Sequence, residues 1–261
     1  MRRSASVVLM CLWASLASAD GIVIDRSCVD ETDRSIPQEF LDKARRLDLI
    51  FGHQSVGGNV LDGLSALAEK DGKRYAVERV EDPAAEWFDD HEGWGDFFAG
   101  ENENPASKCE AFRSKMVDDG LGKHVAVASV KLCWIDFAGK KGEAEKIFAG
   151  YRDTMEILEK AFPKVKFIWW TAPLKTEDNP TRAAYNRLVR DHCRAKGKIL
   201  FDIADIESRT AAAPEPKSPV LLAEYAEDEG HLNETGRLRA ARAWWWLMAR
   251  LAGWDGKPAG K

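Results

Sequence analysis

The sequence predicts an α/β fold in which a mainly parallel sheet is covered by helices on both faces. Short apolar runs alternate with longer amphipathic stretches along the chain, and the run at 125–130 is almost continuously apolar. Continuous apolar runs are typical of strands that helices bury on both sides. Strands that alternate with helices favour right-handed crossovers, which produce a parallel sheet.

The individual elements follow from two periodicities. Strands are expected where short apolar runs are bounded by polar or glycine-rich residues. They are predicted at 47–51, 75–80, 125–130, 165–171 and 199–203. Helices are expected where apolar residues recur every three or four positions and so share one face. They are predicted at 59–69, 143–162, 181–195 and 234–251.

The segment 81–108 is predicted to be a long connection between elements. It contains many acidic residues together with several aromatic ones. Long ordered connections often form lids or binding walls, and exposed aromatic rings can stack on sugars. The alternative is that these rings pack inward as a small satellite core.

The first residues have the features of an export signal. Arg2 and Arg3 precede a short apolar run, and Ala17-Ser18-Ala19 then supplies the small-x-small pattern at which signal peptidase cleaves. We therefore expect a signal peptide at 1–19, a single domain at 20–261, and a periplasmic or secreted location. No later apolar run approaches the roughly 20 residues of a transmembrane helix, so we expect no integral membrane segment after cleavage.

Charge and cysteine content narrow the partners and cofactors. The formal net charge of -5 at pH 7 and the isoelectric point near 5.7 give no attraction to polyanions, so no nucleic-acid partner is expected. The cysteines beyond the signal peptide permit one or two disulfides in an oxidising compartment. They are Cys28, Cys109, Cys133 and Cys193. Their spacing is not that of metal ligands, so no structural zinc is expected.

Two motifs that are far apart in the chain suggest a chemistry. Ser55 follows the first predicted strand in the glycine-rich segment 51–58, and Asp228 and His231 lie just before the last predicted helix. A serine, a carboxylate and a histidine are the components of a nucleophilic hydrolase, in which the histidine removes the serine proton and the carboxylate orients the histidine. Open α/β folds hold their ligands at the carboxyl edge of the sheet, where Ser55 is expected. The alternative is that Ser55 is only a helix N-cap.

These motifs together resemble those of the SGNH, or GDSL-type, hydrolase superfamily. The resemblance spans most of the chain after residue 19 and implies a flavodoxin-like three-layer α/β/α sandwich. It also implies that Ser55 is the nucleophile, His231 the general base and Asp228 the acid that orients the base. The chain looks like a divergent branch, because Gly-His-Gln-Ser at 52–55 stands where the superfamily has Gly-Asp-Ser.

The oxyanion hole departs further from the superfamily pattern. The segment 133–136 reads Cys-Trp-Ile-Asp where the superfamily has Gly-x-Asn-Asp, so its donor asparagine is replaced by Ile135. The Ser55 N–H at the start of a helix is one expected donor. Polar or glycine residues near the predicted edge are candidates for further oxyanion or substrate contacts. They are His53, Gly58, Asn59, Lys131, Asn102 and Asn104, with Gly93, Gly95 and Gly100 as possible matches to the separate glycine of the superfamily.

Two of these residues have other interpretations. Lys131 could form a structural ion pair with Asp136 rather than stabilise an oxyanion. His53 could join Asp228 and His231 as a metal ligand, but these residues lack the tight spacing of a metal motif.

The resemblance implies an exported serine esterase. Such an enzyme would remove acyl groups, with acetyl as the first choice, from a carbohydrate or small-molecule ester through an acyl-enzyme and without a cofactor. Two alternatives remain open. One is a polysaccharide O-acyltransferase that uses the same triad, and the other is a non-catalytic carbohydrate-binding protein on the same fold.

Overall fold

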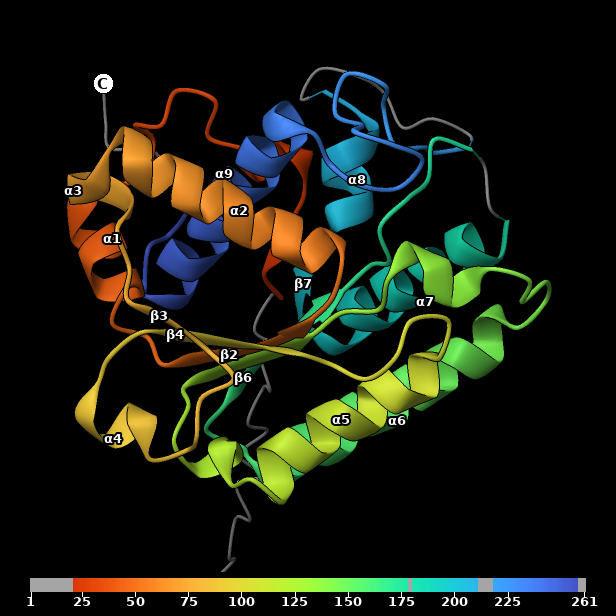
Figure 1. Cartoon of the computed structure of the whole chain (residues 1–261), viewed down its shortest axis with the longest axis horizontal. Helices are drawn as coiled ribbons and strands as arrows, with labels where there is room; N and C mark the ends of the chain where they lie inside the picture. The colour runs from red at the N-terminus through yellow and green to blue at the C-terminus, as the bar shows by residue number, and fades with distance from the viewer. Residues whose placement is uncertain (1–20, 178–179, 211–217, 258–261) are drawn as a thin grey trace, which may run out of the picture.

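A computed structural model describes residues 21–177, 180–210 and 218–257 (Figure 1). The predicted signal peptide at 1–19 lies outside the described residues. The described part contains a seven-stranded sheet with the strand order β1-β7-β6-β5-β2-β4-β3, and every pair of neighbouring strands is parallel. Helices cover both faces of this sheet, which confirms the predicted α/β sandwich (Figure 1).

Most helices and strands lie where the periodicity of the sequence predicts them. The strands are β1 (Val23–Ile24), β2 (Leu49–His53), β3 (Arg79–Glu81), β4 (Trp94–Phe98), β5 (Val127–Val130), β6 (Lys166–Trp170) and β7 (Ile199–Phe201). The α-helices are α1 (Gln38–Ala44), α2 (Val56–Lys70), α3 (Gly72–Tyr75), α4 (Trp87–Asp90), α5 (Pro105–Val117), α6 (Ala144–Ala161), α7 (Pro180–Lys196), α8 (Ile203–Ser208) and α9 (Glu234–Leu251). Three short 3-10 helices are η1 (Arg26–Cys28), η2 (Leu121–Lys123) and η3 (Trp134–Phe137). Over the described ranges, no helix is both long and apolar enough to cross a membrane.

Each face of the sheet carries its own hydrophobic core. The side chains of α1, α2, α8 and α9 pack on one face, and those of α5, α6 and α7 pack on the other (Figure 1). On the first face, the Phe51 ring stacks on Trp170 with centroids 5.2 Å apart, and both rings contact Trp244 of α9. All five residues of β2 are buried, because both faces of this central strand are covered.

The strand order reverses direction at β2. After β2 the chain builds β3 and β4 on one side of it, and then returns to build β5 on its other side. At such a reversal of strand order, the connections leave in opposite directions and leave space above the carboxyl ends of the strands. Ser55 follows β2 by two residues, so it lies at the carboxyl edge of the sheet where the strand order reverses.

Three predicted segments were wrong in detail. The predicted strand at 75–80 is divided, because Tyr75 ends α3 and packs on Trp245, and only Arg79–Glu81 pairs with β4. The predicted connection at 81–108 contains α4, β4 and the start of α5. The predicted strand at 199–203 ends at Phe201, because Asp202 caps α8 by accepting a hydrogen bond from the Asp205 N–H.

The aromatic residues of 81–108 mostly face inward. Phe88, Trp94 and Phe97 are buried, which agrees with the satellite-core alternative rather than with a binding wall. Phe98 is the exception, with 66% of its surface exposed.

The described residues form none of the disulfides that the cysteine count permits. Cys28, Cys109, Cys133 and Cys193 are free thiols, and all four are buried. Burial raises the pKa of Cys109 and of Cys193 to about 12, which keeps both thiols protonated and unreactive.

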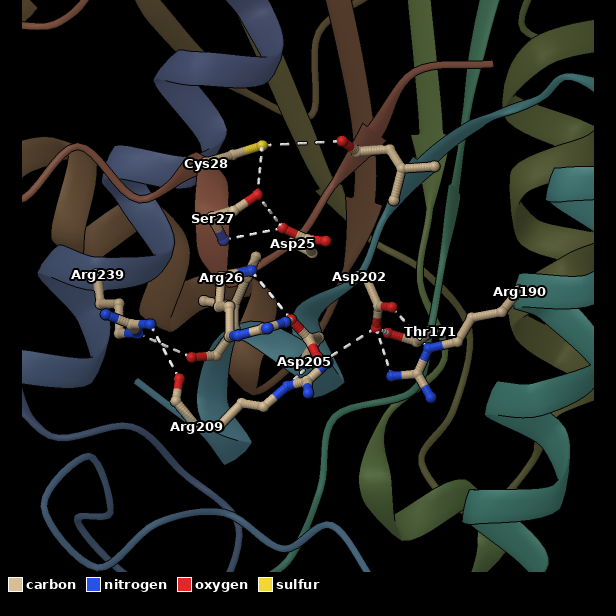
Figure 2. A network of polar contacts seen from close by, with 12 residues as sticks. Asp25, Arg26, Ser27, Cys28, Thr171, Arg190, Asp202, Asp205, Arg209 and Arg239 are labelled. Carbon is tan, nitrogen blue, oxygen red and sulfur yellow. Dashed lines mark hydrogen bonds and ion pairs between the residues drawn. The ribbon is translucent and has the colours of Figure 1, made fainter. Parts of the chain in front are cut away.

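A polar network joins the start of the described chain to α8 and α9 (Figure 2). The Asp205 carboxylate accepts hydrogen bonds from the Arg26 N–H and guanidinium, both at 3.1 Å, and from Arg209. Arg239 of α9 donates to the Arg209 carbonyl at 3.0 Å. Near it, Asp202 accepts from Thr171 and from the Arg190 guanidinium. Charged side chains therefore hold the outer strands and the adjoining helices together.

Candidate active site

Ser55 has a strained backbone at the start of α2. Its φ of 54° and ψ of -115° lie in a region that side-chain-bearing residues rarely adopt. Such strain persists only where the surroundings enforce it, and it is concentrated at functional sites. Ser55 precedes the first helical residue, but its hydroxyl makes no capping hydrogen bond. Ser55 therefore occupies the N-cap position of α2 without capping the helix through its side chain.

The Ser55 hydroxyl is hydrogen-bonded to His231 instead. Its Oγ lies 2.7 Å from His231 Nε2, although 176 residues separate the two in the sequence. The other ring nitrogen, Nδ1, lies 2.8 and 3.0 Å from the two Asp228 oxygens. The serine, histidine and carboxylate thus form one continuous chain of hydrogen bonds.

Asp228 is held by its own loop. One of its oxygens accepts the Gly230 N–H at 2.9 Å and the His231 N–H at 2.8 Å. The Gly230 N–H and the other hydrogen bonds hold the pKa of Asp228 below its ordinary value, because they stabilise the charged form. The carboxylate therefore stays ionised beside the imidazole, and it fixes Nδ1 as the protonated nitrogen.

An indole ring supports the histidine loop from the side. Trp134 of η3 meets the His231 ring edge to face, with centroids 5.9 Å apart. A Cβ atom at Gly230 would lie 2.4 Å from this indole, so only glycine allows the loop to approach so closely. The Lys175 ammonium lies over the indole at 5.4 Å and is paired with Glu229 at 2.7 Å. The sequence pattern placed the segment 133–136 near the site, but no local pattern indicated that Trp134 or Lys175 lies against the histidine loop.

His53 belongs to a second acid-histidine pair beneath the serine. Its Nε2 lies 3.0 Å from an Asp96 oxygen, and its side chain is almost completely buried. A Cβ atom at Gly57 would lie 2.4 Å from the His53 side chain, whereas the space beside Gly58 is open. His53 therefore lies under the first turn of α2 and supports it, while Gly58 borders free space.

The other polar candidates have structural partners. Lys131 is fully buried, and its ammonium lies 3.1 Å from Cys133 Sγ. The predicted pairing of Lys131 with Asp136 is wrong, since the Asp136 carboxylate pairs with the buried Lys108 at 2.8 Å. Asp136 also accepts the Cys133 N–H, which fixes η3. Such a buried pair is stabilising only when its remaining hydrogen bonds are satisfied, as they are here.

The three asparagines that were candidates for oxyanion or substrate contacts lie in different parts of the structure. Asn104 caps α5 by accepting the Ser107 N–H at 3.1 Å, and Asn102 accepts a hydrogen bond from Lys108 at 3.1 Å. Asn59 lies one turn into α2, and its Oδ1 accepts the Leu232 N–H at 3.0 Å. Of the three, only Asn59 contacts the segment that carries His231.

Among the described residues, the backbone N–H groups of Ser55 and Gly100 have no hydrogen-bond partner. Gly100 follows β4 and has a φ of 58°. Gln54 donates to the Ala99 and Gly100 carbonyls, so the Gly100 turn is tied to the residue before the serine. The described residues contain no cluster of histidine, cysteine and acidic side chains that could hold a metal.

Comparison with known proteins gives a likeness in fold. No family profile matches this chain, and no curated protein matches its sequence. A Bacteroides fragilis protein described as an acylhydrolase aligns with a TM-score of 0.52 at 14% identity, over 79% of this chain and 88% of the other. A GDSL-like lipase from Bacteroides thetaiotaomicron aligns with a TM-score of 0.50 at 13% identity, over 80% and 89%.

A third structure adds a carbohydrate enzyme to these neighbours. It is a carbohydrate esterase family 3 protein from Talaromyces cellulolyticus, with a TM-score of 0.50 at 13% identity, over 79% of this chain and 98% of the other. At such low identities, the likeness shows that the chains share a fold.

Proposed function

We propose that this chain is an exported serine esterase that removes short acyl groups, acetyl first among them, from a carbohydrate or small-molecule ester. The hydrogen bond of 2.7 Å between Ser55 Oγ and His231 Nε2 carries this proposal. A serine hydroxyl is a weak nucleophile unless an adjacent base removes its proton as it attacks. In this site the base is in place and is itself oriented by Asp228.

The geometry supports a two-step reaction. Ser55 Oγ attacks the ester carbonyl while His231 takes its proton, and His231 then gives that proton to the departing alcohol. In the second step, water attacks the acyl-enzyme while His231 takes a proton from it, and His231 then returns this proton to Ser55 Oγ as the carboxylic acid leaves. Asp228 stays ionised and stabilises the imidazolium that forms in each step.

The oxyanion of this reaction needs donors, which we assign to the N–H groups of Ser55 and Gly100. Both groups lack another acceptor among the described residues. Lys131 is a weaker choice, because its side chain is fully buried and its ammonium contacts Cys133. Removal of one such donor typically costs about 10²- to 10³-fold in kcat.

The substrate class has less direct support. The likeness to a carbohydrate esterase of similar fold favours an acylated sugar. The net charge of -5 fits a neutral or cationic substrate better than a polyanionic one.

The first prediction concerns the nucleophile. Ser55→Ala is expected to reduce hydrolysis of a chromogenic acetyl ester by about 10⁴-fold or more, because no other hydroxyl is activated by His231. The matched control is Ser65→Ala, which removes a hydroxyl of α2 that is bonded to the Leu61 carbonyl. The control should keep the wild-type rate. Wild-type turnover by a folded Ser55→Ala protein would rule out the serine mechanism.

Product analysis separates hydrolysis from acyl transfer. In an acyltransferase, a sugar hydroxyl replaces water in the second step on the same triad. Incubation with an acetyl donor and an acceptor sugar should therefore yield free acetate if the chain is an esterase, and an acetylated sugar if it is a transferase.

A further inference from the structure

We infer that Asn59 is a positioning residue that sets the distance between the nucleophile and the base. This inference rests on the proposed function, since it concerns the same serine and histidine. It assigns to Asn59 the task of holding the His231 segment against the helix that begins at Ser55. Asn59 acts through the backbone of Leu232 and does not touch the reacting atoms.

The position of Asn59 in α2 provides the first support. Asn59 lies four residues after Ser55, and its N–H donates to the Ser55 carbonyl at 3.2 Å. Residues four apart lie on the same face of a helix, one turn from each other. Asn59 is therefore fixed relative to the nucleophile by the helix backbone.

The contact between Asn59 and Leu232 provides the second support. Asn59 Oδ1 accepts the Leu232 N–H at 3.0 Å, across 173 residues of sequence. Asn59 is only 8% exposed and Leu232 only 1%, so water does not compete for this hydrogen bond. Since Leu232 directly follows His231, the amide of Asn59 ties the base to the helix of the nucleophile.

The far side of Leu232 is also fixed. Its carbonyl accepts a hydrogen bond from Arg237 Nε at 2.8 Å, and the next residue, Asn233, caps α9 through the Gly236 N–H. The His231 backbone carbonyl accepts the Glu227 N–H at 2.9 Å. Lys175 and Thr176 hold this loop at Glu229, and the Asn59 side chain joins it to α2 by a hydrogen bond.

The exposure of the side chains of Asp228 and His231 explains why the loop needs a buried attachment to α2. Asp228 has 53% of its side chain exposed and His231 has 34%, so solvent reaches the acid-base pair. An exposed ion pair contributes little to holding two side chains in one geometry. A misplacement of about 1 Å can cost 10²-fold in rate, so the loop needs buried anchors.

Asn59 could instead be an oxyanion donor, and the two roles use opposite ends of its amide. Positioning uses the Oδ1 acceptor, whereas an oxyanion donor would use the Nδ2 hydrogens. Asn59→Asp keeps an acceptor and removes the donor. Asn59→Leu has a similar shape but removes both, and it leaves the buried Leu232 N–H without a partner.

The test measures the rate at which an alkyl fluorophosphonate labels Ser55. The serine oxygen bonds to phosphorus, fluoride leaves, and His231 takes the serine proton, so the rate reports activation of the nucleophile without turnover. We expect Asn59→Leu to label about 10- to 100-fold more slowly than the wild type. Asn59→Asp should stay within about threefold of the wild type, because it preserves the acceptor.

A double-mutant cycle with His231→Ala identifies the route of the effect. If Asn59 acts through His231, Asn59→Leu should not slow labelling further once the imidazole is absent. The control for a general loss of stability is Ser129→Ala, which removes the buried hydrogen bonds between Ser129 of β5 and Trp170 and Ile168 of β6. This variant should melt earlier but label at the wild-type rate.

The outcomes distinguish the inference from the function on which it rests. A folded wild-type protein that is not labelled would refute the proposed serine mechanism. A labelled wild type with equally fast Asn59→Leu would refute the positioning role alone. Slow labelling of both Asn59 variants, with an undiminished effect in the His231→Ala background, would assign Asn59 to the oxyanion hole and overturn the inference.

Discussion

At the scale of single residues, hydrogen bonds in the site keep the Asp228 carboxylate ionised and hold the proton of the neutral His231 ring on Nδ1. Asp228 accepts three hydrogen bonds from Gly230 and His231, and the resulting low pKa keeps it charged. The charged carboxylate requires a proton on Nδ1, which leaves Nε2 free to accept the Ser55 proton. The reactivity of one serine thus depends on a turn that is 176 residues distant in sequence.

The pH dependence of activity follows from this arrangement. Hydrogen bonds lower the pKa of Asp228 in the folded protein. The side chain is therefore ionised at any pH above its ordinary pKa of about 3.9, and its charge is lost only as the pH falls through the lower folded pKa. Protonation of Asp228 should therefore not limit kcat/KM at pH 4.5 or above. Asp228→Asn should lower kcat by about 10³- to 10⁴-fold, because the amide no longer enforces the Nδ1 proton. Steady-state rates across pH 4.5–9 test both points, and a loss below tenfold would contradict the assigned role.

At the scale of elements, the short helix α8 connects the loops around the site. Its Glu207 accepts the Leu174 N–H from the loop after β6, and the Glu207 carbonyl accepts the Leu222 N–H at 3.1 Å. The first of these loops reaches the histidine loop, since the Thr176 N–H donates to the Glu229 carbonyl at 2.9 Å. A buried acid in α8 therefore helps to place residues that lie against the triad.

Glu207 should make stability depend on pH. Burial raises its pKa to about 8, and its second oxygen has no hydrogen-bond partner among the described residues. Between pH 4.5 and 8 the unfolded chain loses this proton while the folded chain keeps it, so wild-type stability falls as the pH rises. Glu207→Gln stays neutral in both states and should gain on the order of 2–4 kcal/mol relative to the wild type over this range. Thermal melts of both proteins at pH 4.5 and pH 8 measure this gain, and equal differences at the two pH values would refute it.

At the scale of the whole molecule, two hydrophobic cores and one polar network hold the layers together. The cores on the two faces of the sheet are separate, and each contains buried aromatic rings. The network around Asp205 joins η1, α8 and α9, elements from opposite ends of the chain (Figure 2). Closure of the fold therefore depends on contacts that bring the N-terminal and C-terminal segments together.

Asp205→Asn tests whether the network around Asp205 stabilises the fold. Asp205 has 7% of its side chain exposed and is paired with Arg26 and Arg209, so loss of its charge leaves two guanidinium groups without a buried counter-ion. We expect a loss of about 2–4 kcal/mol in the free energy of unfolding, measured by urea denaturation. Glu39→Gln provides the contrast, since the pair of Glu39 with Lys43 is exposed and should contribute less than about 0.5 kcal/mol. Equal effects of the two changes would show that the network does not stabilise the fold.

The sequence alone determined the parts that local periodicity and chain order encode. The predicted helix at 234–251 has the bounds of α9, because its apolar stripe and the Asn233 cap are both local signals. The apolar run at 125–130 gave the position of β5, and the order of the three motif residues indicated a serine, acid and histidine site. These signals need no knowledge of distant contacts.

Tertiary structure decided what depends on contacts across the chain. The segment of β4 was predicted as part of the connection at 81–108, yet it pairs with β2 and β3, because this pairing buries Trp94 and Phe97. The partner of Asp136 proved to be Lys108 on α5 rather than the nearby Lys131. The link from Asn59 to Leu232 likewise spans 173 residues. The energy of such contacts comes from burial and hydrogen bonding that exist only after the layers have packed, so no local pattern records them.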